Sequence, residues 1–423
     1  MNITKLPNII LIVCDTLSAK HMSLYGYDRR TTPNLERLVE EKGFTVYENC
    51  YSTSCWTPPT HASIFTGLYP HEHGVHELNY CLPNNLNTLP EFLKMMGYYT
   101  VGISCNGIIS VPTNFNKGFD VFIELERWQL FNQNSPKFEA FLEYLVNENR
   151  GNLFLKLIKT LRWGIKNKNM SIPGKHILNF VYCNIKGPNK CWFGVTKNAT
   201  PYTLKALRKT KNTLKKSNTF PIFMFINIMQ THHKYNPPKP YKYKWSSINS
   251  PYKKHTQNML EHYSRSPFPS EIIEYFKDLY DEEILFLDSL LYQFINDINL
   301  DNKLVIITSD HGEHFGEYGH LGHILSLHDP VVKVPLLVKY PFSQRYEIVP
   351  NLVQINDIYA TIMDLVCCPM PTPLSSKSLL SSEKRKKAYM EIVHPEVWLN
   401  LIKDGRFRDE QFVRIVDDVK QKT

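Results

Sequence analysis

Residues 8–15 have the sequence NIILIVCD, in which a nearly continuous apolar run ends at an aspartate. A run without polar alternation predicts a strand that is buried on both faces, as in a parallel sheet covered by helices on either side. In such sheets the ligand-binding residues lie just beyond the carboxyl ends of the strands. Asp15 is therefore the first candidate for a functional residue.

Further apolar runs and helical patterns follow along the chain. The runs are 99–104, 220–228, 303–308 and 334–339, and the helical patterns cover 33–39, 87–96 and 271–297. Their alternation predicts an α/β fold with a mostly parallel central sheet flanked by helices. The 423 residues can form one large core or two domains. No apolar run reaches the roughly 18–20 residues that a membrane-spanning helix needs.

Three of the predicted strands end in chemically active side chains. Asp15 follows the first run, His232 follows the run at 220–228, and Asp310 and His311 follow the run at 303–308. Because the carboxyl ends of parallel strands meet at one edge of a sheet, we expect these side chains to lie close together. Their convergence predicts an enzyme rather than a binding module.

Positive charge is concentrated in the middle of the chain. The net charge is +9, from 49 Lys and Arg against 40 Asp and Glu, yet residues 150–260 contain 22 Lys and Arg and no acidic residue. Such a field attracts anions, namely nucleic acid, phospholipid headgroups or an anionic glycan. Nucleic acid is disfavoured because no aromatic-basic motif of a known module is present.

Residues 152–166 have the pattern of a basic amphipathic helix, with apolar residues on one face and Lys or Arg on another. Such a helix can lie on an anionic membrane surface, or it can pack its apolar face on the core of its own protein.

The chain has nine Cys and no CxxC pair, which favours a reducing compartment. The apolar run at 9–13 is too short for a signal peptide. We expect a cytoplasmic protein, with peripheral contact to the inner face of the membrane if residues 152–166 bind lipid.

Six segments together resemble the sulfatase family of the alkaline phosphatase superfamily. They occur in the order of that family and span most of residues 7–341, but about 125–220 shows no match. The resemblance implies an alkaline-phosphatase-like catalytic domain at 1–375 with a basic, mostly helical insertion at about 125–220, and a short C-terminal α+β subdomain at 376–423. Within that subdomain, AYMEIV (388–393) and QFVRIV (411–416) are candidate strands. The six segments are PNIILIVCDTL (7–17), YGYDRRTTPNLERL (25–38), WTPPTHASIFTGLYPHEHGV (56–75), NTLPEFLKMMGYYT (87–100), ITSDHGEHFGEYGHLGH (307–323) and VPLLVKYP (334–341).

The resemblance implies one divalent metal ion held by Asp15, Thr57, Asp310 and His311. The imidazole of His311 favours manganese or zinc, with calcium as the alternative. Sulfatases carry Cys or Ser in a C/S-x-P-x-R pattern, and that residue is oxidised to formylglycine. Here the pattern is TPPTH (57–61), so no formylglycine is expected. Thr57 is then an unmodified, metal-activated nucleophile, as at the similar metal site of phosphoethanolamine transferases and lipoteichoic acid synthases.

Further histidines are candidates for binding the substrate anion or protonating the leaving group. By resemblance these are His232 and His323, and His233 can take the place of His232. His61 stands where the family has Arg, so it either orients Thr57 or fills the space. Asn106, at the end of the run 99–104, is a candidate substrate contact.

Three functions remain open from the sequence. The first is a metal-dependent hydrolase or transferase that cleaves a phosphate or sulfate ester, with an anionic glycan or lipid headgroup as substrate. The second is a true sulfatase with an unmodified nucleophile. The third is a catalytically weak protein that keeps the fold and binds an anion or a glycan through its basic region.

Overall fold

The computed structural model describes residues 6–125, 199–216, 220–254, 269–341, 343–369 and 374–397. Contacts between residues divide the chain into one unit of residues 1–126 and 196–423 and a second unit of residues 127–195. The predicted amphipathic helix at 152–166 lies outside the described residues. The division of the chain at residues 375 and 376 stays a prediction.

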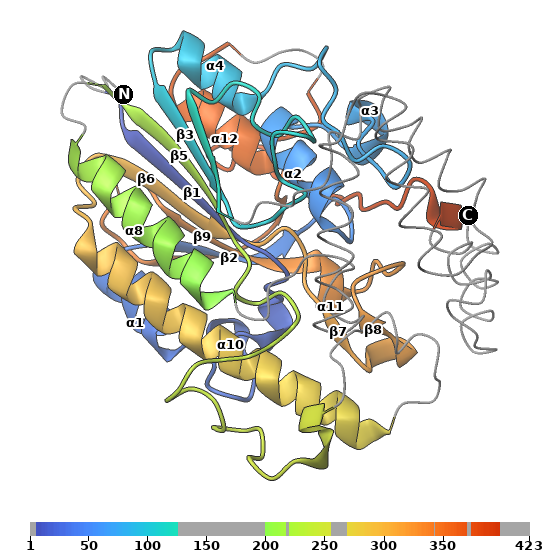
Figure 1. The fold of residues 1–423 in the computed structure, drawn as a ribbon. Helices are drawn as coiled ribbons and strands as arrows, with labels where there is room; N and C mark the ends of the chain where they lie inside the picture. Colours follow the sequence, from blue (N-terminus) through green and yellow to red (C-terminus); the bar gives the residue numbers. More distant parts are fainter. Residues whose placement is uncertain are drawn as a thin grey trace, which may run out of the picture. The chain divides into compact units, whose positions relative to one another are not determined.

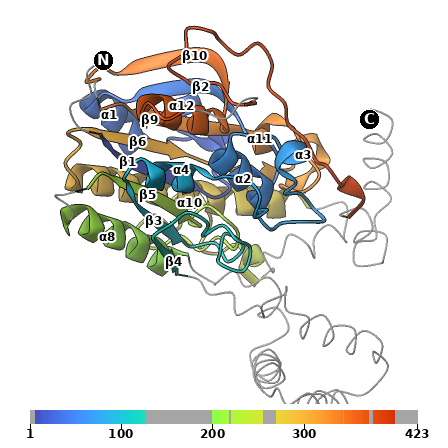
Figure 2. The same cartoon turned by 90° about the horizontal axis from the view of Figure 1, so that it is seen from above.

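An eight-stranded sheet forms the centre of the first unit (Figure 1). Neighbouring strands are parallel except at β9, which runs antiparallel to both β2 and β6. The predicted α/β class with a mostly parallel sheet is therefore confirmed. In spatial order, which Figure 2 shows from top to bottom, the strands are β10 (Glu347–Gln354), β2 (Thr45–Tyr51), β9 (Lys333–Lys339), β6 (Lys303–Thr308), β1 (Asn8–Cys14), β5 (Ile222–Ile228), β3 (Tyr99–Ser104) and β4 (Val121–Glu124).

Helices cover both faces of the sheet, and β1 contributes alternate residues to the two cores. Ile10 and Ile12 belong to one core, and Ile9, Leu11 and Val13 belong to the other. The helices of the first core are α1 (Pro33–Lys42), α8 (Thr200–Lys216) and α10 (Ser270–Asp297). Those of the second core are α2 (Thr57–Thr66), α4 (Leu89–Met95) and α12 (Asp357–Leu365). Burial on both faces explains why β1 is apolar throughout.

The N-terminus of α1 is capped from α10 rather than by its own N-cap residue. Asp288 accepts hydrogen bonds from the backbone N–H groups of Asn34, at 3.0 Å, and Leu35, at 2.7 Å. Thr32, at the N-cap, makes no side-chain cap hydrogen bond. We expect Asp288→Ala to lower the free energy of unfolding by about 1–2 kcal/mol, because buried donors then lose their acceptor. Urea denaturation measures this change.

The control is Glu40→Ala on the exposed side of the same helix. It should change the free energy of unfolding by less than about 0.5 kcal/mol. Equal effects of the two substitutions would show that the hydrogen bonds of Asp288 do not stabilise α1.

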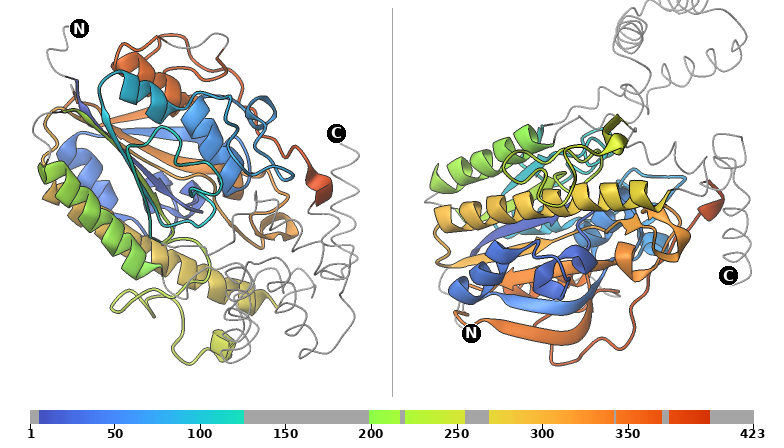
Figure 3. Two further views of the ribbon diagram at one scale, coloured as in Figure 1. Left: turned by 45° about the horizontal axis from the view of Figure 1, so that its top comes forward. Right: turned by 90° about the horizontal axis from the view of Figure 1, so that it is seen from below.

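The end of the described chain runs along the outside of the sheet toward the short helix α3 (Pro70–His73), as Figure 3 shows. The predicted strand at 388–393 is wrong, because the structure has no strand there. Two hydrogen bonds join this segment to the chain before α2: Glu391 N–H donates to the carbonyl of Thr53 (3.1 Å), and Ser54 Oγ donates to that of Glu391 (2.8 Å). The second predicted strand, at 411–416, lies outside the described residues. Among the helices of the described chain, none has the length and apolar character that crossing a bilayer requires.

Candidate active site

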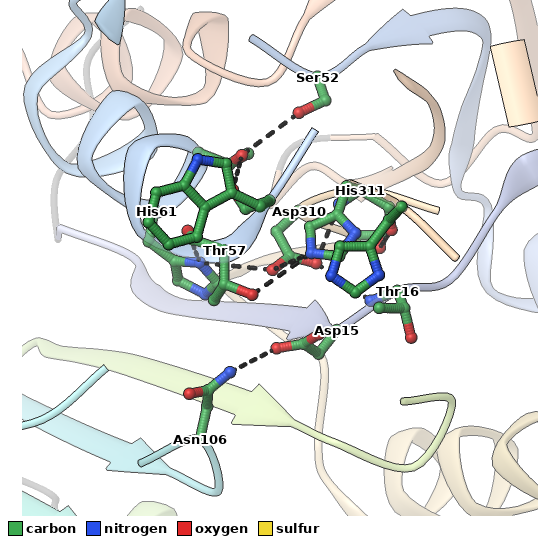
Figure 4. A network of polar contacts seen from close by, with 12 residues as sticks. Asp15, Thr16, Ser52, Thr57, His61, Asn106, Asp310 and His311 are labelled. Carbon is green, nitrogen blue, oxygen red and sulfur yellow. Dashed lines mark hydrogen bonds and ion pairs between the residues drawn. The ribbon is translucent and has the colours of Figure 1, made fainter. Parts of the chain in front are cut away.

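Three adjacent strands end at the residues that the sequence predicts to be functional. β6, β1 and β5 are neighbours in the sheet, and they are followed by Asp310 and His311, by Asp15, and by His232. The structure brings Asp15, Asp310 and His311 together with Thr57 at the start of α2 (Figure 4).

The two carboxylates each keep one oxygen that accepts no hydrogen bond, although Asp310 Oδ2 lies 3.6 Å from His61 Nδ1 and from His311 Nε2. The ligand atoms of Asp15, Asp310 and His311 lie within 4.8 Å of one another, and all three residues are fully buried. Asn106 donates to Asp15 Oδ2 at 2.7 Å, and the backbone N–H groups of Thr16 and His311 donate to Asp310 Oδ1 at 3.1 and 2.9 Å. Asp15 Oδ1 and Asp310 Oδ2 accept no hydrogen bond.

Unpaired carboxylate oxygens inside a protein are unfavourable unless a cation binds them. Burial, and next the charge of Asp310, raises the pKa of Asp15. A divalent cation beside both oxygens would remove this repulsion. Two carboxylates, an imidazole and a hydroxyl are donors that manganese and zinc accept. The residues therefore fit the metal ion that the resemblance implies.

His311 offers an unprotonated nitrogen to this cluster. Its Nδ1 lies 3.0 Å from the carbonyl oxygen of Gly312, which can only accept, so Nδ1 carries the proton. Burial, and next the charge of His323, lowers the pKa of His311 to about 3, so the ring is neutral. Nε2 therefore has a lone pair for a metal ion or for a hydrogen bond from a hydroxyl group.

Thr57 is the first residue of α2 and is 6% exposed. Its Oγ1 lies 3.3 Å from His311 Nε2. The helix can begin here because Pro58 and Pro59 occupy its first turn, where the missing N–H groups would have no partner in the helix. The partial positive charge at a helix N-terminus favours an alkoxide over a hydroxyl. The hydroxyl of Thr57 thus lies at the N-terminus of a helix and beside His311.

His61 supports the first turn of α2 from inside the protein. It is fully buried, its Nδ1 donates to the carbonyl of Thr57 (2.9 Å), and its Nε2 accepts from the side chain of Asn227 (3.3 Å). The ring also packs edge-on against Phe225, with 5.9 Å between ring centroids. Both ring nitrogens of His61 therefore have protein partners. Of the two roles left open by the sequence, orientation of Thr57 agrees with this geometry.

A buried glutamate that the sequence analysis did not single out holds His323. Glu313 is fully buried and accepts a hydrogen bond from His323 Nδ1 at 2.8 Å and one from Tyr235 at 3.3 Å. Burial alone would raise the pKa of Glu313, but the charge of His323 and their hydrogen bond lower it to about 2. Burial would lower the pKa of His323, but the charge of Glu313 raises it. Each residue of the pair therefore stabilises the charged form of the other.

His323 and His232 lie next to Asp15, Asp310 and His311, which we call the metal-ligand cluster because their ligand atoms could hold a metal ion. The ring of His323 lies 4.4 Å from the ring of His311 and 5.9 Å from the ring of His232. His232 Nδ1 donates to the carbonyl of His233, and the two rings stack at 4.5 Å. Burial, and next the charge of His232, lowers the pKa of His233 well below its usual range. Of the adjacent pair, His232 is the one with a ring contact to His323.

Two threonines that the sequence analysis did not identify join the loops after β1 and β5. Thr16 Oγ1 donates to the carbonyl of Thr231 (2.7 Å), and Thr231 Oγ1 donates to that of Asp15 (2.6 Å). Thr16 has a φ of 59°, a left-handed conformation that is uncommon for a β-branched residue. In this conformation its N–H donates to Asp310, so the strained backbone helps to hold the Asp310 carboxylate in place.

Asn106 is hydrogen-bonded to Asp15, a candidate metal ligand, instead of lying free for the substrate. Its amide donates to Asp15 Oδ2, while its Oδ1 accepts from the N–H of Ile108 at 2.8 Å. We expect Asn106→Ala to weaken metal binding by about 10–100-fold, because Asp15 then loses the bond that fixes its carboxylate. Titration of the metal-free protein with manganese measures this affinity. Asn49→Ala, which removes an amide bound to the carbonyl of Pro350, should bind manganese as the wild type does.

The fold and the site define an α/β protein in which the hydroxyl of Thr57 lies beside a cluster of carboxylate and histidine side chains. The family model described as Sulfatase matches residues 7–367, so the chain belongs to the sulfatase family of ester-cleaving enzymes. Its fold also has neighbours throughout the alkaline phosphatase superfamily.

Individual relatives are distant but cover most of the chain. The N-acetylglucosamine-6-O-sulfatase of Bacteroides thetaiotaomicron is 23% identical, over 89% of this chain and 70% of its own. The phosphonate monoester hydrolase of Agrobacterium radiobacter has a TM-score of 0.63 at 16% identity, over 93% of this chain and 83% of its own. The C-terminal periplasmic domain of EptC from Escherichia coli, in complex with zinc, has a TM-score of 0.57 at 15% identity, over 92% of this chain and 90% of its own. At these identities the solved structures show a common fold.

Proposed function

We propose that this chain hydrolyses a sulfate or phosphate ester of a glycan, with Thr57 as nucleophile and a divalent metal ion held by Asp15, Thr57, Asp310 and His311. The observation that carries the proposal is the pair of unpaired oxygens, Asp15 Oδ1 and Asp310 Oδ2, beside His311 Nε2 and Thr57 Oγ1. A metal ion bound here would lower the pKa of the Thr57 hydroxyl and offset the negative charge of the ester.

The residues around the nucleophile have distinct tasks in this proposal. Thr57 Oγ1 attacks the sulfur or phosphorus atom, and His61 holds the first turn of its helix in place. His323, kept positive by Glu313, binds an oxygen of the transferred group or donates a proton to the leaving oxygen. His232, beside His323, is the second candidate for the same two tasks.

The relatives support both kinds of ester. The name of the Bacteroides thetaiotaomicron relative specifies the 6-O-sulfate of N-acetylglucosamine, which supports a sulfated glycan. An unmodified threonine supports a phosphoester, because an alkoxide suits attack at phosphorus and the sequence has no residue for formylglycine at this position. Transfer to a sugar hydroxyl is the second candidate, favoured by the likeness to the fold of EptC. Cytoplasmic location and membrane contact through residues 152–166 stay predictions.

Turnover of paired nitrophenyl esters tests the proposal. Sulfate, phosphate monoester, phosphate diester and phosphonate are each incubated with manganese, zinc, calcium or a chelator. We expect turnover of at least one ester that is lost with chelator and restored by manganese or zinc. Turnover that resists the chelator would contradict the metal site. No turnover with any metal would favour the binding protein, and transfer to an added sugar alcohol in place of water would favour the transferase.

A further inference from the structure

The segment that follows His232 and His233 carries lysines that the proposed chemistry does not use. Residues 234–254, which we call the lysine loop, contain six Lys and no Asp or Glu. They belong to the acid-free region of the sequence. In Figure 1 the loop is yellow-green and runs beside α10, on the side away from the sheet.

Two buried glutamates of α10 fix the backbone of the lysine loop. Glu283 accepts a hydrogen bond from the N–H of Asn236 at 2.6 Å. Glu282 accepts from the N–H groups of Trp245 and Ser246 at 2.9 and 2.7 Å. Because the backbone is held by buried acceptors, the lysines are presented from a defined surface.

Three of the lysines approach aromatic rings, and Lys242 also interacts electrostatically with the buried Glu283. Lys242 and Lys253 approach the ring of Tyr243, at 5.5 and 5.3 Å from its centroid, and Lys244 lies 5.1 Å from that of Trp245. Within the described residues, none of these lysines, nor Lys239, forms an ion pair with a carboxylate. Two ammonium groups near one ring repel each other, so an anion between them would be favourable.

Arg29 differs from these lysines. It also approaches the ring of Trp245, at 5.8 Å from the centroid, but carboxylates neutralise its charge. Its guanidinium forms ion pairs with three carboxylates of α10. Lys239, Lys244 and Lys253 are exposed and form no such ion pair with any described carboxylate. The unbalanced charge therefore belongs to the lysine loop and not to the neighbouring helix.

A chain of contacts connects the lysine loop with the candidate active site. His323 is bound to Glu313, which accepts a hydrogen bond from Tyr235 at 3.3 Å. The next residue, Asn236, accepts a hydrogen bond from Lys242 Nζ at 2.7 Å. The lysine loop is therefore joined to the candidate active site through the interior of the protein, and it follows His232 and His233 directly in the chain.

We infer that the lysine loop binds sulfate or phosphate groups of the same glycan chain whose ester lies at Thr57, so that the substrate is a polyanionic oligosaccharide and not a monosaccharide ester. The inference rests on the proposed function for the position of the ester. A membrane surface fits less well for two reasons. Cations approach the rings of Tyr243 and Trp245. In addition, Ile248 is the one strongly exposed large apolar residue of the described loop. Rings approached by cations are also poor stacking platforms for bases.

Binding to the catalytically blocked protein tests the inference without turnover. In a Thr57→Ala background, Lys239, Lys244 and Lys253 are replaced together by Gln, and calorimetry measures the affinity for a sulfated hexasaccharide and a phosphorylated one. We expect the triple variant to bind at least one of the two ligands at least about tenfold more weakly than the Thr57→Ala parent does. The affinity of the variant should also depend less on the salt concentration. The control replaces the exposed Lys384, Lys386 and Lys387 by Gln, which removes the same charge and should change affinity less than twofold.

The outcomes separate the inference from the proposed function. Equal affinity of the two triple variants would overturn the inference, as would binding to phosphatidylglycerol vesicles or single-stranded DNA but to neither hexasaccharide. Lysine-dependent hexasaccharide binding without turnover of any nitrophenyl ester would uphold the lysine loop and contradict the proposed hydrolysis. Matching melting temperatures of the two triple variants would show that a loss of affinity does not come from unfolding.

Discussion

Thr57→Ala should lower turnover of the preferred nitrophenyl ester by at least about a thousandfold, because it removes the hydroxyl that we propose as the nucleophile. Thr57 Oγ1 is 3.3 Å from His311 Nε2, and Asp15, Asp310 and His311 keep their positions without it. The variant should therefore still bind manganese while it loses activity. Steady-state kinetics and a metal titration on the same sample separate the two effects.

Two matched variants sharpen this prediction. Thr57→Ser keeps a hydroxyl and should retain measurable turnover. Thr66→Ala removes a threonine hydroxyl that donates to the carbonyl of Ala62 at the other end of α2, so its turnover should stay within about twofold of the wild type. If Thr57→Ala keeps more than a tenth of wild-type turnover, Thr57 is not the nucleophile.

Asp357→Ala should lower the free energy of unfolding by about 3–5 kcal/mol, because it leaves the buried guanidinium of Arg385 without its counter-charge. The side chains of these residues are 2% and 7% exposed and bind through two nitrogens of the guanidinium. Asp357 also accepts from the N–H groups of Gln354 and Lys377, at 2.9 and 2.8 Å. The carboxylate thus joins β10, α12 and the segment after residue 374. Equilibrium denaturation in urea measures the loss.

An exposed ion pair of the same segment is the control. Lys377 and Glu383 form an ion pair with side chains that are 39% and 78% exposed. Because water solvates both charges, Glu383→Ala should leave the denaturation midpoint unchanged. A midpoint shift for Glu383→Ala as large as that for Asp357→Ala would mean that the burial of the Arg385 pair does not matter to stability.

The strands at the centre of the sheet were predictable because burial on both faces leaves a simple pattern. β1, β5 and β6 are apolar runs, and their order in space places Asp15, His232 and Asp310 side by side. β2 and β10 were not predicted. β2 carries Glu48 and Asn49, and β10 is a largely exposed edge strand that contains Pro350, so neither has a continuous apolar run.

The sequence patterns do not predict the direction of a strand or the strand with which it pairs. β9 was predicted as a strand, but its antiparallel direction follows from contacts with β2 and β6 that lie far away along the chain. The strand expected at 388–393 has the right composition, yet it meets the chain before α2 through two hydrogen bonds and forms no ladder. A strand needs a partner edge, and its own residues do not reveal one.

The sequence by itself determined the α/β class and singled out Asp15, Asp310 and His311, which lie together in the structure, because apolar runs and the strand-end motifs are local properties of the chain. Only the tertiary structure decided what the neighbouring side chains do. It buries His61 against Phe225 and Asn227, turns Asn106 toward Asp15 and pairs His323 with Glu313. The physical reason is that the proton position, charge and orientation of a buried polar group depend on its partners, and these come from distant parts of the chain.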